Sequence, residues 1–262
     1  MPKASRNRDI AQARSRVAEM RAREARQVRQ RRLFMGIGAA VLAIAAAVGI
    51  SLAVANGGGK PGSHTSTPKL NLGPLTPLGP LKPAPSAGQA GFENVPIPAA
   101  PTLAGMSLAA TGGKVDGIGC QTAEQTIFHI HSHLTIFING TQRQIPAGVG
   151  LPGSRTVQSQ QGQVAQGESC LYWLHTHAPD GIIHVESPIH RTYTLGNFFD
   201  EWGQTLGPSN LGPVKGHVVA IYNGQLYKGD PRDIPLNAHA QIQLEVGKPL
   251  VAQQKISFPS GL

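Results

Sequence analysis

The chain has 262 residues, with 23 Lys and Arg against 14 Asp and Glu, and a formal net charge of +9. Residues 1–32 hold eleven of those basic residues and only three acids, so the rest of the chain is almost neutral. The excess charge therefore belongs to a tail. It argues against a basic nucleic-acid-binding domain, and we expect no nucleic acid as a partner.

The N-terminal region predicts a membrane anchor. Residues 1–32 favour helix but lack an apolar stripe wide enough for a core, which is typical of a solvated cytoplasmic tail beside anionic lipid. Residues 33–55 contain no charged residue. At ~1.5 Å per residue they would form a helix about 34 Å long, enough to cross ~30 Å of hydrocarbon. Because basic flanks stay cytoplasmic, we expect a single-pass protein of the cell membrane with residues 56–262 outside.

A cleaved export signal is the alternative. Ala53-Val54-Ala55 resembles a signal-peptidase site, and Arg31-Arg32 resembles a twin-arginine signal. We favour a retained anchor because the basic region and the apolar run are both longer than in a signal peptide. Either interpretation sends the C-terminal part out of the cytoplasm.

Residues 56–101 have the composition of a linker. They hold ten of the 21 prolines and begin near Gly57-Gly58-Gly59. Proline at such short intervals blocks helices and strand pairing, so we expect a semi-extended spacer. The folded part would then be a β-rich extracytoplasmic domain over residues 102–262.

The first informative segment of that domain runs from Thr126 to Ile138. Its apolar residues alternate with His129, His131 and His133, which is typical of a strand with one core face and one histidine face. Asn139-Gly140 then predicts a hairpin turn, because both residues tolerate positive φ. We expect the three imidazoles side by side, either exposed or lining a cleft.

A second histidine-bearing hairpin follows a polar, Gln- and Gly-rich stretch, residues 148–167, that predicts a long loop. One strand covers 170–177, residues 178–181 form a turn, and the chain returns over 182–187. This pairing places His175 opposite His184. Residues opposite each other share a face, so His175, His177 and His184 should converge.

The remaining elements predict the fold class. Thr194 can cap a short helix over 195–203, and strands follow on both sides of a second Asn-Gly turn at Asn223. Hairpin, helix and three strands over 170–246 is also the element order of a β-grasp domain. We predict an α+β fold: a mainly antiparallel β domain with one short helix. A cupredoxin-like or cupin-like sandwich is the alternative.

Cys120 and Cys170 are the only cysteines. In an oxidising compartment two cysteines of one domain most often pair, so we predict a disulfide between them. The alternative is a cysteine metal ligand, as in a blue-copper site.

The histidine clusters predict a transition-metal site. Neutral imidazole is the commonest protein ligand for zinc and copper, and several rings without an obligatory thiolate suit Cu(II) or Zn(II). The alternative is an inert histidine-rich surface, and the HxH motif alone is weak. The candidate ligands are His129, His131, His133, His175, His177 and His184.

Two carboxylates accompany these histidines. Glu186 is a candidate to orient an imidazole from outside the coordination shell, or to act as a general base. Asp180, which precedes Gly181, is better explained as a turn residue. His190, His217 and His239 are expected to be structural or surface groups.

The stretch CLYWLHTHAPDGIIHVESP, with FHIHSHLTIFING before it and YTLGNFFDEWGQ after it, resembles uncharacterised exported, membrane-anchored proteins of high-GC Gram-positive bacteria. The resemblance covers residues 117–246. It implies a location in the cell envelope and a histidine-lined site, and it implies no established activity.

Three functions are compatible with the sequence. The preferred one is a membrane-tethered domain that binds copper or zinc through its histidines. The others are a metal-dependent envelope enzyme, a hydrolase or oxidase, and an adhesion or assembly domain with incidental histidines. Chelation needs only the rings, whereas catalysis also needs an open coordination position, an acid or base, and a pocket. The sequence does not distinguish an enzyme from a binding module.

Overall fold

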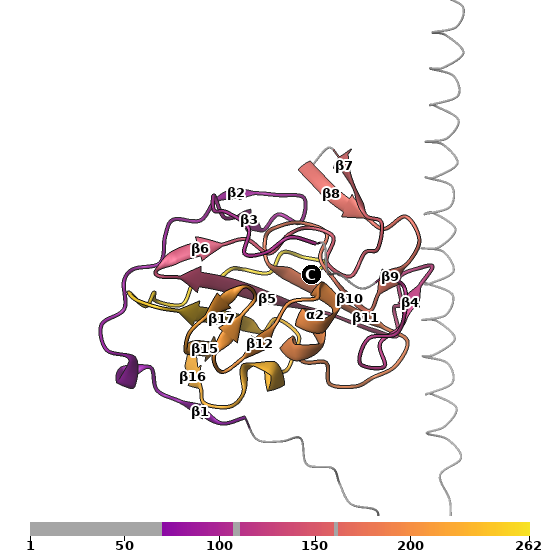
Figure 1. Ribbon diagram of the computed structural model, residues 1–262. Helices are drawn as coiled ribbons and strands as arrows, with labels where there is room; N and C mark the ends of the chain where they lie inside the picture. Colours follow the sequence, from indigo (N-terminus) through magenta and orange to yellow (C-terminus); the bar gives the residue numbers. More distant parts are fainter. Residues whose placement is uncertain (1–69, 107–110, 160–161) are drawn as a thin grey trace, which may run out of the picture. The chain divides into compact units, whose positions relative to one another are not determined.

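The long strand β5 (Phe128–Ile138) lies inside an eight-stranded sheet (Figure 1). The computed structural model describes residues 70–106, 111–159 and 162–262, which belong to one compact unit. The strand order is β1-β16-β15-β17-β5-β11-β10, and β6 pairs with β5 beyond the end of β11. All pairs are antiparallel except β5 with β17. The other strands of this sheet are β1 (Leu72–Gly73), β6 (Thr141–Arg143), β10 (Leu174–His175), β11 (Ile182–Ser187), β15 (Val218–Tyr222), β16 (Gln225–Tyr227) and β17 (Gln241–Val246).

Shorter pairings surround this sheet. They are β2 (Gln89–Ala90) with β3 (Pro96–Ile97), β4 (Cys120–Gln121) with β9 (Leu171–Tyr172), β7 (Arg155–Ser159) with β8 (Gly162–Gln166), and the three-stranded set β12 (Leu206–Gly207), β13 (Asn210–Leu211) and β14 (Val214–Lys215). The β7–β8 pair lies where the sequence predicts a long loop.

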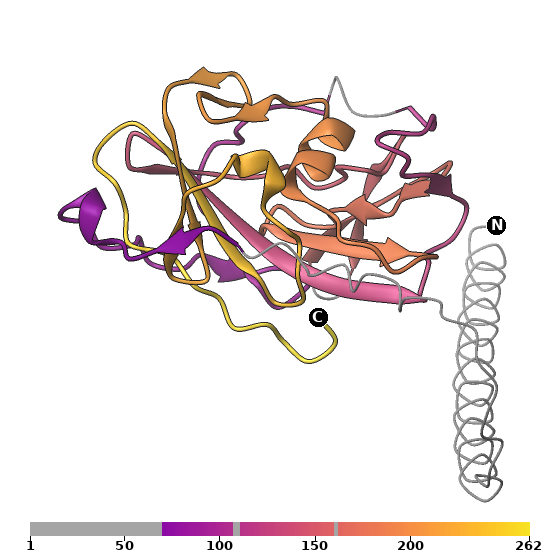
Figure 2. The ribbon, with the colours of Figure 1, turned by 90° about the horizontal axis from the view of Figure 1, so that it is seen from below.

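One α-helix, α2 (Leu195–Trp202), is present among the described residues, with two 3-10 turns at η1 (Thr76–Leu78) and η2 (Pro231–Asp233). The Thr194 side chain caps α2 by accepting from the Asn197 backbone N–H, and Gly203 ends it in the left-handed region at φ 71°. Figure 2 shows α2 on one side of β5. Phe198, Phe199 and Trp202 are fully buried in the main apolar cluster there.

These observations confirm the expected fold class: the described residues are mostly β, with antiparallel pairing dominant and one short helix. The β-grasp element order is present in part: the β10–β11 hairpin, α2 and the strands β15, β16 and β17 follow one another, with the short strands β12 to β14 between α2 and β15. Among the described residues, the other sheets have only two or three strands each, so the main sheet has no second large sheet with which to form the alternative sandwich.

Both predicted Asn-Gly turns are present. Asn139 and Gly140 have φ of 51° and 70°, and Asn223 and Gly224 have φ of 49° and 84°. Both positions of each turn are therefore left-handed, which matches the right-handed twist of the strands they join.

The linker prediction does not hold for its C-terminal part. Leu72 and Gly73 pair with Tyr227 and Leu226, and Lys82 makes an isolated bridge to Val251. Proline removes a backbone donor, which excludes central strands but permits two-residue edge strands and single bridges. The folded unit therefore includes residues 70–101, ahead of the predicted boundary at 102.

The predicted tail at 1–32, the transmembrane helix at 33–55 and the N-terminal part of the linker lie outside the described residues. Within the described ranges, no helix has both the length and the apolar character needed to cross a bilayer.

The predicted disulfide is confirmed. Cys120 and Cys170 are bonded, with their Cα atoms 5.4 Å apart. Cys120 begins β4, and Cys170 directly precedes β9, which pairs with β4. Both sulfurs are occupied by this bond, so neither cysteine is available as a thiolate metal ligand.

We expect the Cys120→Ser, Cys170→Ser double variant to lose about 4 kcal/mol of unfolding free energy, because the bond closes a fifty-residue loop in the unfolded chain. Urea unfolding of both proteins measures this loss. Adding reductant should shift the parent protein toward the variant and leave the variant unchanged. Equal unfolding midpoints would contradict the expectation.

A buried carboxylate on α2 has no compensating partner. Glu201 is fully buried, and neither of its carboxylate oxygens has a hydrogen-bond partner in the described part of the chain. Burial, reinforced by the charge of Asp116, raises the pKa of Glu201 well above its ordinary value. The folded protein thus retains a proton on Glu201 that the unfolded chain loses above pH ~4.3, the ordinary pKa of a glutamate carboxyl.

Stability should therefore fall as pH rises from about 4.3 toward the raised pKa of Glu201, because the folded state binds more protons there. We expect Glu201→Gln to remove this contribution to the slope and to raise the unfolding free energy at pH 8, because glutamine has no proton to lose in the unfolded chain. Urea unfolding at pH 5 and pH 8 measures both effects, with exposed Glu124→Gln as the matched control. A slope unchanged in Glu201→Gln would show that this carboxyl does not titrate as its burial implies.

Candidate metal centre

Three adjacent strands align the histidines in rows across one face of the sheet. In the register of β5 with β11, His131 faces His184 and His129 faces Glu186. In the register of β11 with β10, His184 faces His175, as the sequence predicts. Opposite residues share a face, so the rings of β5, β11 and β10 stand side by side.

The opposite face of β5 belongs to the apolar core. Leu134, Ile136 and Ile138 pack in the cluster that includes α2, so period-two alternation places the histidines on the other side. That other side is covered rather than open: His131, His175 and His184 are between 0 and 6% exposed. His129, with 38% of its side chain exposed, and the half-buried His177 lie at the margin.

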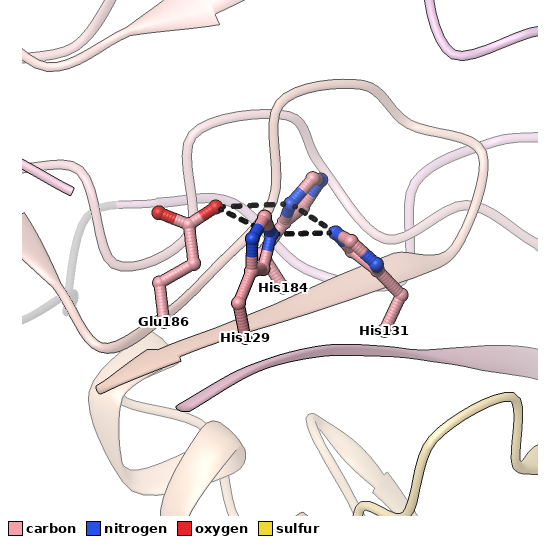
Figure 3. A group of neighbouring side chains, drawn as sticks. All are labelled: His129, His131, His184 and Glu186. Atoms are coloured by element: carbon pink, nitrogen blue, oxygen red, sulfur yellow. Dashed lines mark hydrogen bonds and ion pairs between the residues drawn. The ribbon is translucent and has the colours of Figure 1, made fainter. Parts of the chain in front are cut away.

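The first group contains His129, His131, His184 and Glu186 (Figure 3). His131 Nε2 lies 3.1 Å from both His129 Nε2 and His184 Nδ1. Glu186 Oε1 lies 3.3 Å from His129 Nε2 and 3.5 Å from His184 Nδ1. Two ligands of one tetrahedral ion, each bound at ~2.0–2.1 Å, are ~3.3 Å apart. The measured separations match that spacing.

The second group contains His175, His177 and His184, whose ligand atoms lie within 4.8 Å of one another. The rings of His175 and His184 are stacked, with centroids 5.1 Å apart, and His177 meets both edge-on. His184 is therefore common to the two groups.

Hydrogen bonds determine which nitrogen of two rings, His175 and His177, carries a proton. His175 Nδ1 is 2.9 Å from the Tyr172 carbonyl oxygen, and His177 Nδ1 is 2.9 Å from the Ala165 carbonyl oxygen. A carbonyl oxygen only accepts, so each Nδ1 donates and each Nε2 retains a lone pair. Backbone carbonyls commonly orient metal-binding histidines in this way.

His184 is oriented by a carboxylate that the sequence analysis missed. Its Nε2 lies 2.5 Å from Glu93 Oε1, which leaves Nδ1 directed at His131 and Glu186. Glu93 is 8% exposed and comes from the segment between β2 and β3. Glu93 lies in the predicted linker, where it is the only acid among residues 56–101. A single acid in an otherwise uncharged or basic segment was the one sequence signal that could have pointed to Glu93 as a site residue.

The buried charges of this site are coupled. Although burial lowers it, hydrogen bonds to Glu186 and Glu93 raise the pKa of His184 to about 9. Burial, with the charge of His184, lowers the pKa of His131 to about 3 and that of His175 well below 6.5. Without metal, His184 is therefore an imidazolium beside the neutral rings of His131 and His175. Neutral rings are the form that binds metal, so an incoming cation would displace the His184 proton.

The sequence predicts Glu186 as a carboxylate that orients an imidazole or acts as a general base. Its Oε1 lies 3.3 to 3.9 Å from ring nitrogens of His129, His175 and His184, so it can also be a ligand itself. Asp180 is confirmed as a turn residue, because its Oδ1 accepts from the Ile182 N–H and Gly181 has φ 90°. Burial and the neighbouring Glu93 charge raise the pKa of Asp180 to about 8.

His133 belongs to neither group. Its Nε2 lies 2.9 Å from the Asp180 carbonyl oxygen, so this ring nitrogen donates away from the other rings. It lines a cleft of about 500 Å³ together with Thr135 and Asp180, whose lining includes none of the five converging histidines. The structure therefore brings together five of the six predicted ligands.

The remaining histidines lie elsewhere, as expected. His190 packs on Phe128, His239 stacks on Phe258, and His217 is exposed. His64 lies outside the described residues.

Comparisons with known proteins add no family. No family model matches the chain, and neither a curated protein nor a solved structure matches it. Function must be argued from the site alone.

Proposed function

We propose that this protein is a membrane-tethered, extracytoplasmic domain that binds copper or zinc through its clustered histidines, for storage, delivery or sensing of the metal. The observation that carries the proposal is the common orientation of the ring nitrogens. His175, His177 and His184 are each tied at one nitrogen, and their free nitrogens belong to the two groups of neighbouring ligand atoms. Random burial of histidines would not leave the acceptor nitrogens of separate strands next to one another.

The donor set supports copper or zinc over other ions. The candidate ligands are imidazole nitrogens and one carboxylate, and the disulfide removes both thiols. Hard ions such as Ca²⁺ and Mg²⁺ take oxygen ligands, whereas Cu(II) and Zn(II) are well served by imidazole. This chain's own residues bind and orient the ion, and the covering segment with Glu93 limits the access of water to it.

The location rests on the apolar segment 33–55 and its basic flank. The disulfide supports the same location, because disulfides persist in oxidising compartments.

We expect the purified full-length protein, loaded with Zn(II) or Cu(II) and then desalted, to retain metal that elemental analysis detects. The His131→Ala, His184→Ala double variant should retain less metal than the parent protein, because these two residues supply a 3.1 Å ligand pair at the centre of the first group. His217→Ala is the matched control, since that ring is exposed and belongs to neither group. A parent protein that retains no metal under these conditions would reject the proposal.

Glu93→Gln tests the orienting role of the covering segment. Gln can accept from His184 Nε2 but lacks the charge, so we expect metal affinity to fall by about 10- to 100-fold. Competition with a chromophoric chelator measures the change, and the exposed Glu124→Gln variant is the control. Unchanged affinity would mean that Glu93 covers the site without tuning it.

A further inference from the structure

The site contains more ligands than one copper or zinc ion ordinarily takes. Five histidines and Glu186 contribute six candidate ligand atoms, and Glu93 adds a carboxylate in contact with one of those rings. Zinc sites are almost always four-coordinate. The candidate ligands therefore outnumber the coordination positions of a single zinc ion.

The first group alone completes one coordination shell. His129, His131, His184 and Glu186 provide three nitrogens and one oxygen, with separations of 3.1 to 3.5 Å along the measured contacts. An ion among these four atoms would leave His175 and His177 without a role in binding.

The two remaining rings are nevertheless prepared as ligands. Each donates its Nδ1 proton to a backbone carbonyl, so each Nε2 carries a lone pair. His175 Nε2 is buried without a hydrogen-bond partner in the described part of the chain. A buried acceptor without a partner is costly, and an ion bound there would satisfy it.

The buried carboxylates also exceed what the first ion takes as ligands. Glu93 and Glu186 are both at most 8% exposed, and Glu93 lies against the ring that the two groups share. The first ion has Glu186 as its anionic ligand. Glu93 then remains at Nε2, the other ring nitrogen of His184.

From this arrangement we infer that the centre binds two ions, which deepens the proposed function and rests on it. The first ion takes the first group. The second lies on the β10 side, bound by His175 Nε2 and His177 Nε2, with Glu93 at the His184 ring as the nearby negative charge. The His184 ring stands between the two ions.

Zinc stoichiometry tests this inference on the full-length protein. Calorimetric titration and elemental analysis should give two Zn(II) per chain, one in His177→Ala and one in His129→Ala, because each variant removes a ligand of a different ion. His217→Ala should keep two. One ion in the parent protein would overturn the two-ion centre and leave the proposed function intact, whereas no ion would overturn both.

A measurement on the unaltered protein covers variants that fail to fold. Loaded with Cu(II), the parent protein should show two copper ions by elemental analysis and an electron paramagnetic resonance spectrum broadened by coupling between them. Two coppers without coupling, or two ions still bound in both single variants, would overturn the inference.

Discussion

The structure depends on one strand that is buried on both faces. On one face of β5, Leu134, Ile136 and Ile138 pack in the cluster that contains α2, and on the other face His131 and His133 are at most 5% exposed. Period-two alternation makes both faces possible at once, because each residue type falls on its own side. Apolar burial on the first side stabilises the sheet, and the rigid sheet then sets the spacing of the rings on the second.

Burial of the histidine face has an electrostatic consequence. A buried imidazole is disfavoured as a cation, so the rings around His184 stay neutral, while His184 is charged between Glu93 and Glu186. The backbone carbonyls of Tyr172 and Ala165 accept hydrogen bonds from the Nδ1–H groups of His175 and His177. Without metal, the neutral rings of His131 and His175 offer lone pairs beside the protonated His184. A cation that binds there displaces the His184 proton.

The segments outside the main sheet complete this arrangement. The Pro-rich stretch 70–101 supplies an edge strand, a bridge to Val251 and the carboxylate that orients His184. The Cys120–Cys170 bond joins β4 to the segment leading into β10, so a covalent link lies close to the strand that carries His175. Small pairings of this kind add little core, and their role is to position side chains and cover polar atoms.

Local sequence was sufficient for a substantial part of this description. The alternation in β5, the Asn-Gly turns, the Thr194 cap and the pairing of His175 with His184 each follow from residues close in sequence or from simple strand geometry. Such features depend on backbone preferences that a short window contains. The same reasoning correctly gave a mainly antiparallel fold with one helix.

Tertiary structure alone decided the rest. That β11 lies between β5 and β10, and so brings His129 and His131 beside His184, depends on which strands are neighbours, and no local pattern specifies that. Glu93 meets His184 across 91 positions, and His133 turns to the Asp180 carbonyl because the turn packs against β5. The sequence by itself determined which residues share a strand face; packing between distant segments determined which of them meet, because long-range contacts depend on the whole chain and not on its local periodicity.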